Sequence, residues 1–224
     1  MKGTIIIAMN KINILLTGAN GNLSDKKEMI GKAIKVAEEY VFPKLKIDWD
    51  IDVLVTNRLN DILIPEDGVG GRTIVSDFIM FAINQEKATE ALISEVLVHE
   101  LCHAVRWGKN NEWMNSLFDG VINEGIATYF EAEFIKNRNE KTVFIQTILK
   151  RPDEENEKIL DQIRDSLNSN QYDYYEIFFT GNSSLPRWSG YSLGFYLVKK
   201  YLEKTGKTIE EAFADKYADF KIIL

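Results

Sequence analysis

The sequence predicts an α+β fold in which a small N-terminal sheet precedes a mainly helical C-terminal part. Short β-rich runs bounded by turn residues are confined to about the first 83 of the 224 residues. Longer segments with helical periodicity follow them. Between the two parts lies a strongly apolar helical stretch, residues 94–107, that contains both histidines of the chain.

Composition limits the classes of function. With 27 basic and 34 acidic residues the net charge is −7, which argues against a general nucleic-acid partner or an anionic membrane. No run approaches the ~18 apolar residues of a membrane span, and the apolar start is too short for a signal peptide. One cysteine excludes an internal disulfide framework. We therefore expect a cytoplasmic protein of ordinary globular composition.

The first elements follow from local patterns. The apolar run at residues 5–7 predicts a strand that residues 12–16 continue or pair with. A helix is expected from an N-cap at Ser24 to about residue 41, and Pro43 should end it. Residues 51–55 alternate as a half-buried strand.

The next segment leads into the apolar helix. Gly68, Gly70 and Gly71 predict a turn before a short strand at residues 73–75. Residues 78–83 predict a further strand, which on pattern alone can be an interior strand of the sheet.

The apolar helix carries the pattern His99-Glu100-x-x-His103. Each helical residue advances about 100°, so both imidazoles can aim at one point. Glu100 can reach a water on a metal bound there without being a ligand itself. Two histidines, a third ligand, an open position and a base make a zinc hydrolase. A histidine pair satisfied within the core is the plainer alternative, but buried polar groups without a metal cost several kcal/mol.

The third zinc ligand follows by elimination. No other histidine exists, and Cys102 lies about 100° around the helix from His103. Arg106 and Lys109 occupy the positions where metzincins need glycine and histidine. A carboxylate is left, and Glu124 is the candidate.

Turn residues explain how Glu124 can reach the histidines. Gly108–Asn111 and Asp119–Gly120 predict turns, so the chain can reverse and enter a second helix near whose start Glu124 lies. Thr128 and Glu131 follow on the same face of that helix. Either can orient a ligating histidine from behind, or can simply be helix surface.

These motifs resemble those of the gluzincin metallopeptidases, the thermolysin-like and aminopeptidase-like group. The chain matches them at the histidine motif, at Asn123-Glu124-x-x-Ala127 and at Tyr191-x-x-Gly194, and looks most like a family of small bacterial predicted zinc-dependent proteases. The resemblance implies a zincin-like fold with a cleft between an N-terminal lobe, residues 1–118, and a helical lobe, residues 119–224. It also implies that the strand at residues 78–83 lines the cleft and offers its free edge to an extended substrate.

The resemblance implies an activity as well. Zn²⁺ held by His99, His103 and Glu124 activates a water for hydrolysis of a peptide or protein substrate, with Glu100 as base. Tyr191 stabilises the oxyanion. Without a Gly-x-Met-Glu-Asn run for a free amino terminus, an endo- or oligopeptidase is favoured.

Three questions stay open at this point. One alternative is a catalytically silent zinc-binding protein that acts as a partner-binding module, although a structural site usually has four protein ligands. Another is a metallohydrolase acting on a substrate other than a peptide. The aromatic segment at residues 172–188 can either cover the cleft as a lid or simply pack on the surface.

Overall fold

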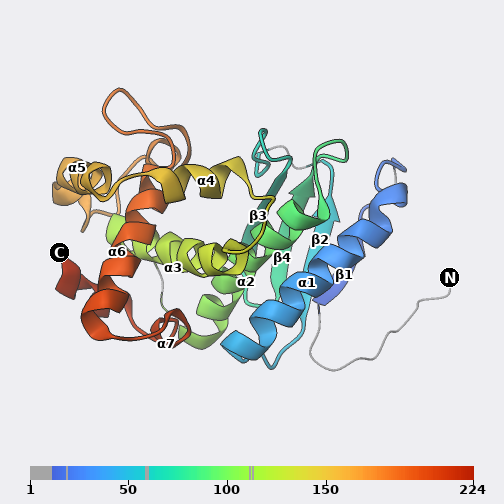
Figure 1. Ribbon diagram of the computed structural model, residues 1–224, viewed down its shortest axis with the longest axis horizontal. Coiled ribbons are helices and arrows are strands. Elements are labelled where there is room, and N and C mark those ends of the chain that lie inside the picture. Colours follow the sequence, from blue (N-terminus) through green and yellow to red (C-terminus); the bar gives the residue numbers. More distant parts are fainter. Residues whose placement is uncertain (1–11, 19, 59–60, 111, 113) are drawn as a thin grey trace.

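The computed structural model describes residues 12–18, 20–58, 61–110, 112 and 114–224. The strand expected at residues 5–7 lies outside these residues. The described chain is an α+β fold, as the sequence predicts, with a small sheet at one end and a helical part at the other (Figure 1).

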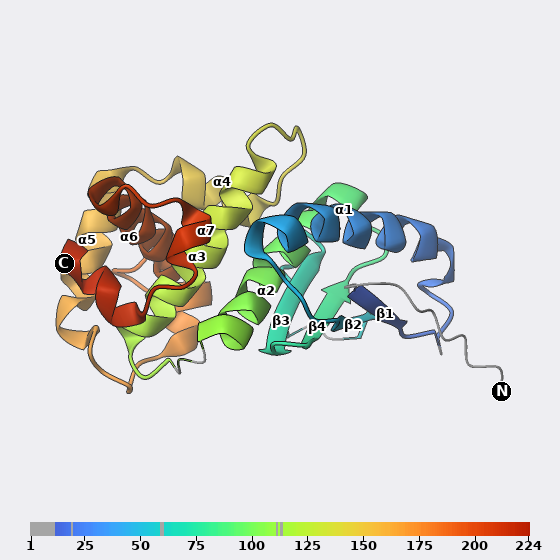
Figure 2. The same ribbon diagram turned by 90° about the horizontal axis from the view of Figure 1, so that it is seen from below.

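The sheet has four strands in the order β1-β2-β4-β3. Their bounds are β1 Ile12–Leu16, β2 Ile51–Thr56, β3 Val69–Val75 and β4 Phe78–Ile83. β1, β2 and β4 are parallel, and β3 pairs antiparallel with β4. Helices α1 (Lys27–Leu45) and α2 (Glu90–Asn110) lie together on one face of this sheet (Figure 2).

Helix α1 continues past the residue expected to end it. Pro43 lies inside its last turn, and the helix ends at Leu45, followed by Lys46 in the left-handed conformation. A proline removes one backbone hydrogen bond, whereas continuing the helix buries Phe42 and Leu45. Burial of these side chains outweighs that loss.

The glycine pair Gly70 and Gly71 is in a strand and not in a turn. Gly70 and Gly71 belong to β3, and β3 is one of the two edge strands of the sheet. Close approach of other groups explains both glycines: a Cβ on Gly70 would lie 1.9 Å from the Ile62 carbonyl oxygen, and one on Gly71 would lie 2.4 Å from Glu100. β4 is therefore an interior strand, and the expectation that residues 78–83 offer a free edge was wrong.

Two further stretches expected to be turns are helical, the first of them at residues 108–110, since residue 111 lies outside the described residues. α2 continues through Gly108, where a Cβ would lie 2.8 Å from the Trp49 ring. α3 (Leu117–Ile135) begins at the Ser116 N-cap, so Asp119 and Gly120 form part of its first turns. Glu124 consequently lies in the body of α3 and not near its start. Packing and a good cap decided against the turn signals in each case.

Further helices follow α3 in the chain. Pro152 separates α4 (Val143–Lys150) from α5 (Asp153–Ile163). A π-helical turn at Glu176–Thr180 precedes α6 (Ser189–Thr205), and the Thr208–Glu211 capping box starts the short helix α7 (Ile209–Ala212). None of the helices within the described part of the chain is both long and apolar enough to cross a membrane.

α3 and α6 cross at a pair of glycines. A Cβ on Gly125 would lie 2.3 Å from the carbonyl group of Gly194, and one on Gly194 would lie 2.2 Å from the carbonyl oxygen of Val121. The two backbones therefore touch at a point where any side chain would hold them apart. Because Glu124 precedes one glycine and Tyr191 lies one turn before the other, the crossing brings these two side chains to the same region.

Candidate metal centre

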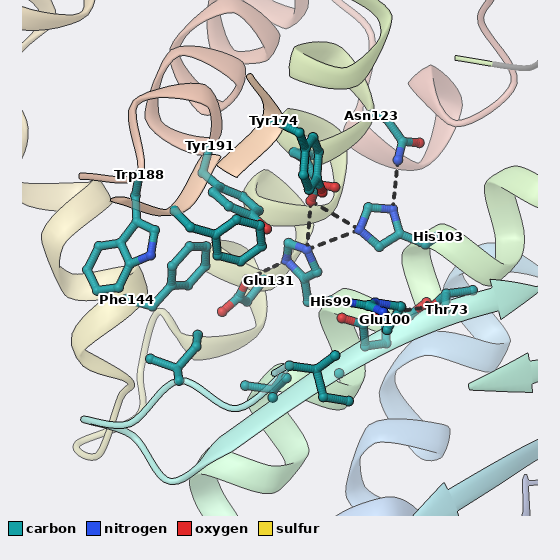
Figure 3. Close-up of a pocket in the computed structure, with 18 of the residues that line it drawn as sticks. Thr73, His99, Glu100, His103, Asn123, Glu131, Phe144, Tyr174, Trp188 and Tyr191 are labelled. Atoms are coloured by element: carbon teal, nitrogen blue, oxygen red, sulfur yellow. Dashed lines mark hydrogen bonds and ion pairs between the residues drawn. The ribbon is translucent and has the colours of Figure 1, made fainter. Parts of the chain in front are cut away.

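Three side chains converge between α2 and α3. His99 and His103 extend from α2 (Figure 3). Glu124 extends from α3, and all three side chains are buried. The two Nε2 atoms are 3.1 Å apart, and each lies 3.2 Å from Oε2 of Glu124. Tetrahedral zinc with bonds of ~2.0–2.1 Å separates its ligand atoms by roughly 3.3 Å. The three atoms therefore already have the spacing of three corners of a zinc tetrahedron.

Each histidine is held from behind by another residue of α3. Oε2 of Glu131 lies 2.8 Å from Nδ1 of His99, and the Asn123 amide lies 3.0 Å from Nδ1 of His103. These contacts fix both rings so that Nε2 faces the cluster. Partners of this kind orient metal-binding histidines and raise their basicity.

Asn123 connects His103 to the C-terminal residues. The Tyr217 hydroxyl donates to Oδ1 of Asn123 at 3.2 Å, which leaves Nδ2 facing the histidine. A histidine that binds metal through Nε2 keeps its proton on Nδ1, and that proton needs an acceptor. A half-turn of the amide presents Oδ1 to His103 and lets Nδ2 donate to Tyr217. The site residues thus fit zinc with one amide rotation.

The charges in the cluster are strongly coupled. Burial by itself raises the pKa of Glu124, but the charges and hydrogen bonds of His103 and His99 outweigh burial and lower that pKa to about 2. Burial by itself lowers the pKa of His99, but hydrogen bonds with Glu124 and Glu131 raise it well above 6.5. Without a metal, a proton on His99 balances the negative charge of Glu124. A divalent cation bound between the two groups would take the place of that proton.

A second buried carboxyl group lies behind Glu131. Glu95 accepts hydrogen bonds from the backbone N–H of Thr142 at 3.1 Å and from its hydroxyl at 2.5 Å. Burial, and next the charge of Glu131, raise the pKa of Glu95 to about 9. Glu95 is therefore neutral at pH 7. Burial also raises the pKa of Glu131, although the hydrogen bond and charge of His99 act in the opposite direction.

Glu100 lies beside the cluster and beneath β3. The Thr73 hydroxyl is 2.8 Å from Oε2 of Glu100, so one carboxylate oxygen is held by β3. Gly71 lies against the same side chain, and its missing Cβ leaves the room that the carboxylate occupies. Glu100 is held next to the three potential ligands without being one of them, as a general base must be.

Tyr191 approaches the cluster from α6. Its ring centroid lies 6.2 Å from that of His99, and its hydroxyl end is directed toward the histidines (Figure 3). Phe144 and Phe178 pack edge-on against this ring. Burial, and next the charge of Glu124, raise the pKa of Tyr191 well above 10, so the phenol keeps its proton at neutral pH.

The cluster opens into a pocket of about 340 Å³. β3 forms one wall through Gly70, Gly71 and Thr73. The aromatic segment at residues 172–188 does line the pocket, and its contributing side chains are Tyr174, Tyr175, Phe179 and Trp188.

The structure brings most of the expected site residues together. His99, Glu100, His103, Glu124 and Tyr191 all line the pocket, and Glu131 contacts a histidine. The Thr128 hydroxyl, in contrast, has no hydrogen-bond partner among the described residues.

Sequence reasoning assigned no role to four neighbours of the site. Asn123 and Tyr217 lie behind His103, while Gly71 and Thr73 hold Glu100. Adjacent glycines inside a β-rich run are a signal of close backbone approach, which fits Gly71. The role of Tyr217 has no local signal in the sequence.

Comparison with known proteins gives one finding. No curated protein matches the chain. Residues 27–221 match the family described as "Predicted Zn-dependent protease (DUF2268)". That range contains both histidines, Glu100, Glu124 and Tyr191. The chain therefore belongs to this family of predicted zinc-dependent proteases.

Proposed function

We propose that the protein is a zinc-dependent peptidase of the gluzincin type, in which a metal-activated water hydrolyses a peptide bond of a peptide or protein substrate. The observation that carries the proposal is a cluster of three potential ligand atoms, from His99, His103 and Glu124, all within 4.8 Å of one another. The carboxylate of Glu100, which is not one of the three, lines the same pocket. The family's description agrees with it. A structural zinc site would usually need a fourth protein ligand, and the cluster found among the described residues has three.

Glu100 and Tyr191 have separate roles in the proposed reaction. Zn²⁺ supplies Lewis acidity and an acidified water when bound. Glu100 accepts a proton from that water and passes it to the leaving nitrogen as the C–N bond breaks, so that one water is consumed for each bond. Tyr191 donates a hydrogen bond to the oxyanion; one such donor contributes roughly 3 kcal/mol.

The backbone of a substrate can bind along the edge of β3. β3 is an edge strand, and an extended peptide can add to such an edge through main-chain hydrogen bonds. Gly71 and Thr73 are the strand residues that contact Glu100, so a peptide paired there would pass over the base.

Replacing Glu100 with Gln tests the proposal. The variant keeps the shape of the side chain but cannot take a proton, so we expect unchanged zinc content and at least ~100-fold slower peptide hydrolysis. Elemental analysis and a mass-spectrometric peptide assay measure both quantities. Near wild-type cleavage by this variant would show that another residue is the base or that the activity comes from a contaminant.

A further inference from the structure

At one end of the pocket, here named the closed end, the segment before β3 contacts the helical part, and Ile62 and Ile64 of this segment line the pocket. The Glu66 carboxylate pairs with the Arg187 guanidinium through two contacts, at 2.6 and 3.2 Å. The neighbouring Asp67 is buried and accepts hydrogen bonds from the backbone N–H groups of Val143 at 2.6 Å and Phe144 at 3.3 Å. A segment before β3 is thereby fixed to the start of α4 and to the residue preceding Trp188.

The same segment occupies the edge of β3 at that end. The backbone N–H of Ile64 donates to the carbonyl of Val69 at 3.0 Å, so the first residue of the strand is already paired on its outer side. At Gly70 the Ile62 carbonyl takes the place that a Cβ would fill. An added strand can therefore pair with Gly71 and the residues after it, but it meets Ile62 and Ile64 before it reaches Val69.

These contacts limit the length of chain that fits beyond Glu100. Gly71 lies against the Glu100 carboxylate, and the edge of β3 is occupied two positions earlier, at Val69. Strands rise ~3.3 Å per residue, so roughly 7 Å of extended chain fits on that side. This length corresponds to about two residues.

The direction of β3 decides which end of a substrate lies there. β3 runs from the closed end, near Phe144 and Trp188, toward Thr73 (Figure 3). Antiparallel strand pairs are slightly more stable per residue than parallel pairs. A peptide paired antiparallel with β3 directs its carboxyl end toward Val69. Aromatic side chains of Phe144, Trp188 and Tyr191 line this end and suit an apolar residue in the leaving fragment.

We propose that the closed end makes this protein a peptidase that cuts near the carboxyl terminus of its substrates and releases fragments of one or two residues. The inference rests on the proposed function and adds the position of the cut: the protein acts at a chain end, in place of the endo- or oligopeptidase that the sequence favours.

Product length tests the inference directly. The substrates are peptides of alanine and serine with one phenylalanine, acetylated at the amino end and lengthened by up to six alanines at either end. With the zinc-loaded protein we expect released fragments of one or two residues whatever the length, identified by mass spectrometry. A folded domain fused to the carboxyl end should slow cleavage at least tenfold, and the same domain at the amino end less than twofold. Internal cuts that release six residues, or fragments counted from the amino end, would overturn the inference.

A double variant tests whether the contact between Glu66 and Arg187 limits the length of the released fragment. Glu66→Ala with Arg187→Ala removes the exposed ion pair, and such pairs add little to stability, so the variant should fold. We expect released fragments of three or more residues to appear. We also expect a domain fused to the carboxyl end to slow cleavage several-fold less than it does in the wild-type protein. The control is Lys44→Ala, which removes a similar pair with Glu210 away from the pocket and should change neither quantity. An unchanged fragment length in the double variant would count against the inference.

Measurements of peptide binding test this inference independently of the hydrolytic activity. Zinc-loaded Glu100→Gln protein and dye-labelled peptides give affinities by fluorescence anisotropy without turnover. A carboxyl-terminal fusion should weaken binding at least tenfold, and an amino-terminal fusion less than twofold. If that asymmetry occurs while the wild-type protein cleaves no peptide, the proposed function fails and the closed end stands. Equal effects of the two fusions, or no binding of any peptide, would refute the closed end itself.

Discussion

The glycine crossing of α3 and α6 makes a quantitative prediction for Gly125→Ala. The new Cβ would lie 2.3 Å from the carbonyl carbon and oxygen of Gly194, whereas ordinary contacts begin near 3.4 Å. The helices must therefore separate by ~1 Å, because backbone atoms cannot turn aside as a side chain can. Overpacking costs about 1–3 kcal/mol, and alanine returns up to ~1 kcal/mol of helix propensity.

This separation of the two helices should lower both the free energy of unfolding and kcat. We expect a net loss of about 1–2 kcal/mol in the free energy of unfolding, which lowers Tm by roughly 2–8 °C for a chain of this size. Because α6 carries Tyr191, a ~1 Å shift should also reduce kcat by up to ~100-fold. Urea denaturation and a peptide cleavage assay give the two numbers, and zinc content should remain unchanged because the ligands lie on α2 and α3.

Two other helical glycines provide matched controls. A Cβ on Gly120, also in α3, would make ordinary contacts at 3.4 Å or more, and one on Gly31 in α1 would meet nothing within 4 Å. Alanine at either position should be neutral or stabilising by up to ~1 kcal/mol, with full activity. If Gly125→Ala behaved like these two, the close crossing would not be what positions α6, and the reasoning would be refuted.

Three further outcomes are expected. Glu124→Ala should sharply reduce zinc content in elemental analysis, because two histidines alone make a weak site, and undiminished zinc would mean that another residue is the third ligand. Tyr191→Phe should keep fold and zinc while kcat falls by roughly two orders of magnitude, whereas Tyr196→Phe, on the same helix, should leave kcat unchanged; an unaltered kcat in the first variant would leave Tyr191 a packing residue. In the metal-free protein, the pKa of Glu124 is lowered to about 2, so this group stabilises the fold above pH 4.5 and the stabilisation is lost as the pH falls from there. The pKa of His99 is raised, so this group stabilises the fold below about pH 6.5 and that stabilisation is lost as the pH rises. Urea midpoints measured with chelator should therefore be highest between those values, and a profile that is the same in Glu124→Ala would contradict the coupling.

The three residues of the candidate metal site could be predicted from the sequence because their geometry is largely local. A spacing of four on one helix fixes His99 relative to His103, and the single cysteine and absence of further histidines leave a carboxylate. The position of Glu124 within α3 was missed because Asp119 and Gly120 have turn propensity, which the Ser116 cap and burial of the helix overrule.

Other features depended on contacts between distant segments. Gly70 and Gly71 look the same in sequence whether they form a turn or allow Ile62 and Glu100 to approach a strand. The edge position of β3 likewise depends on strand order, which no periodicity encodes. Helical spacing placed Thr128 and Glu131 on one face, but only the packing of α2 against that face shows that Glu131 reaches a histidine.

The contact of Tyr217 with Asn123 connects the turn at residues 213–217, which leads into the final 3₁₀ helix, to His103, a candidate metal ligand. Arg106, whose guanidinium lies over the Tyr217 ring and donates to the carbonyls of Phe213 and Asp215, holds that turn against α2. Because ligand binding and local unfolding share one free-energy cycle, a turn that steadies His103 must itself be steadied by zinc to the same extent. Backbone amides around residues 213–217 should then exchange with solvent more slowly in the zinc-loaded protein. The carboxyl-terminal turn would thus report metal occupancy without touching the metal.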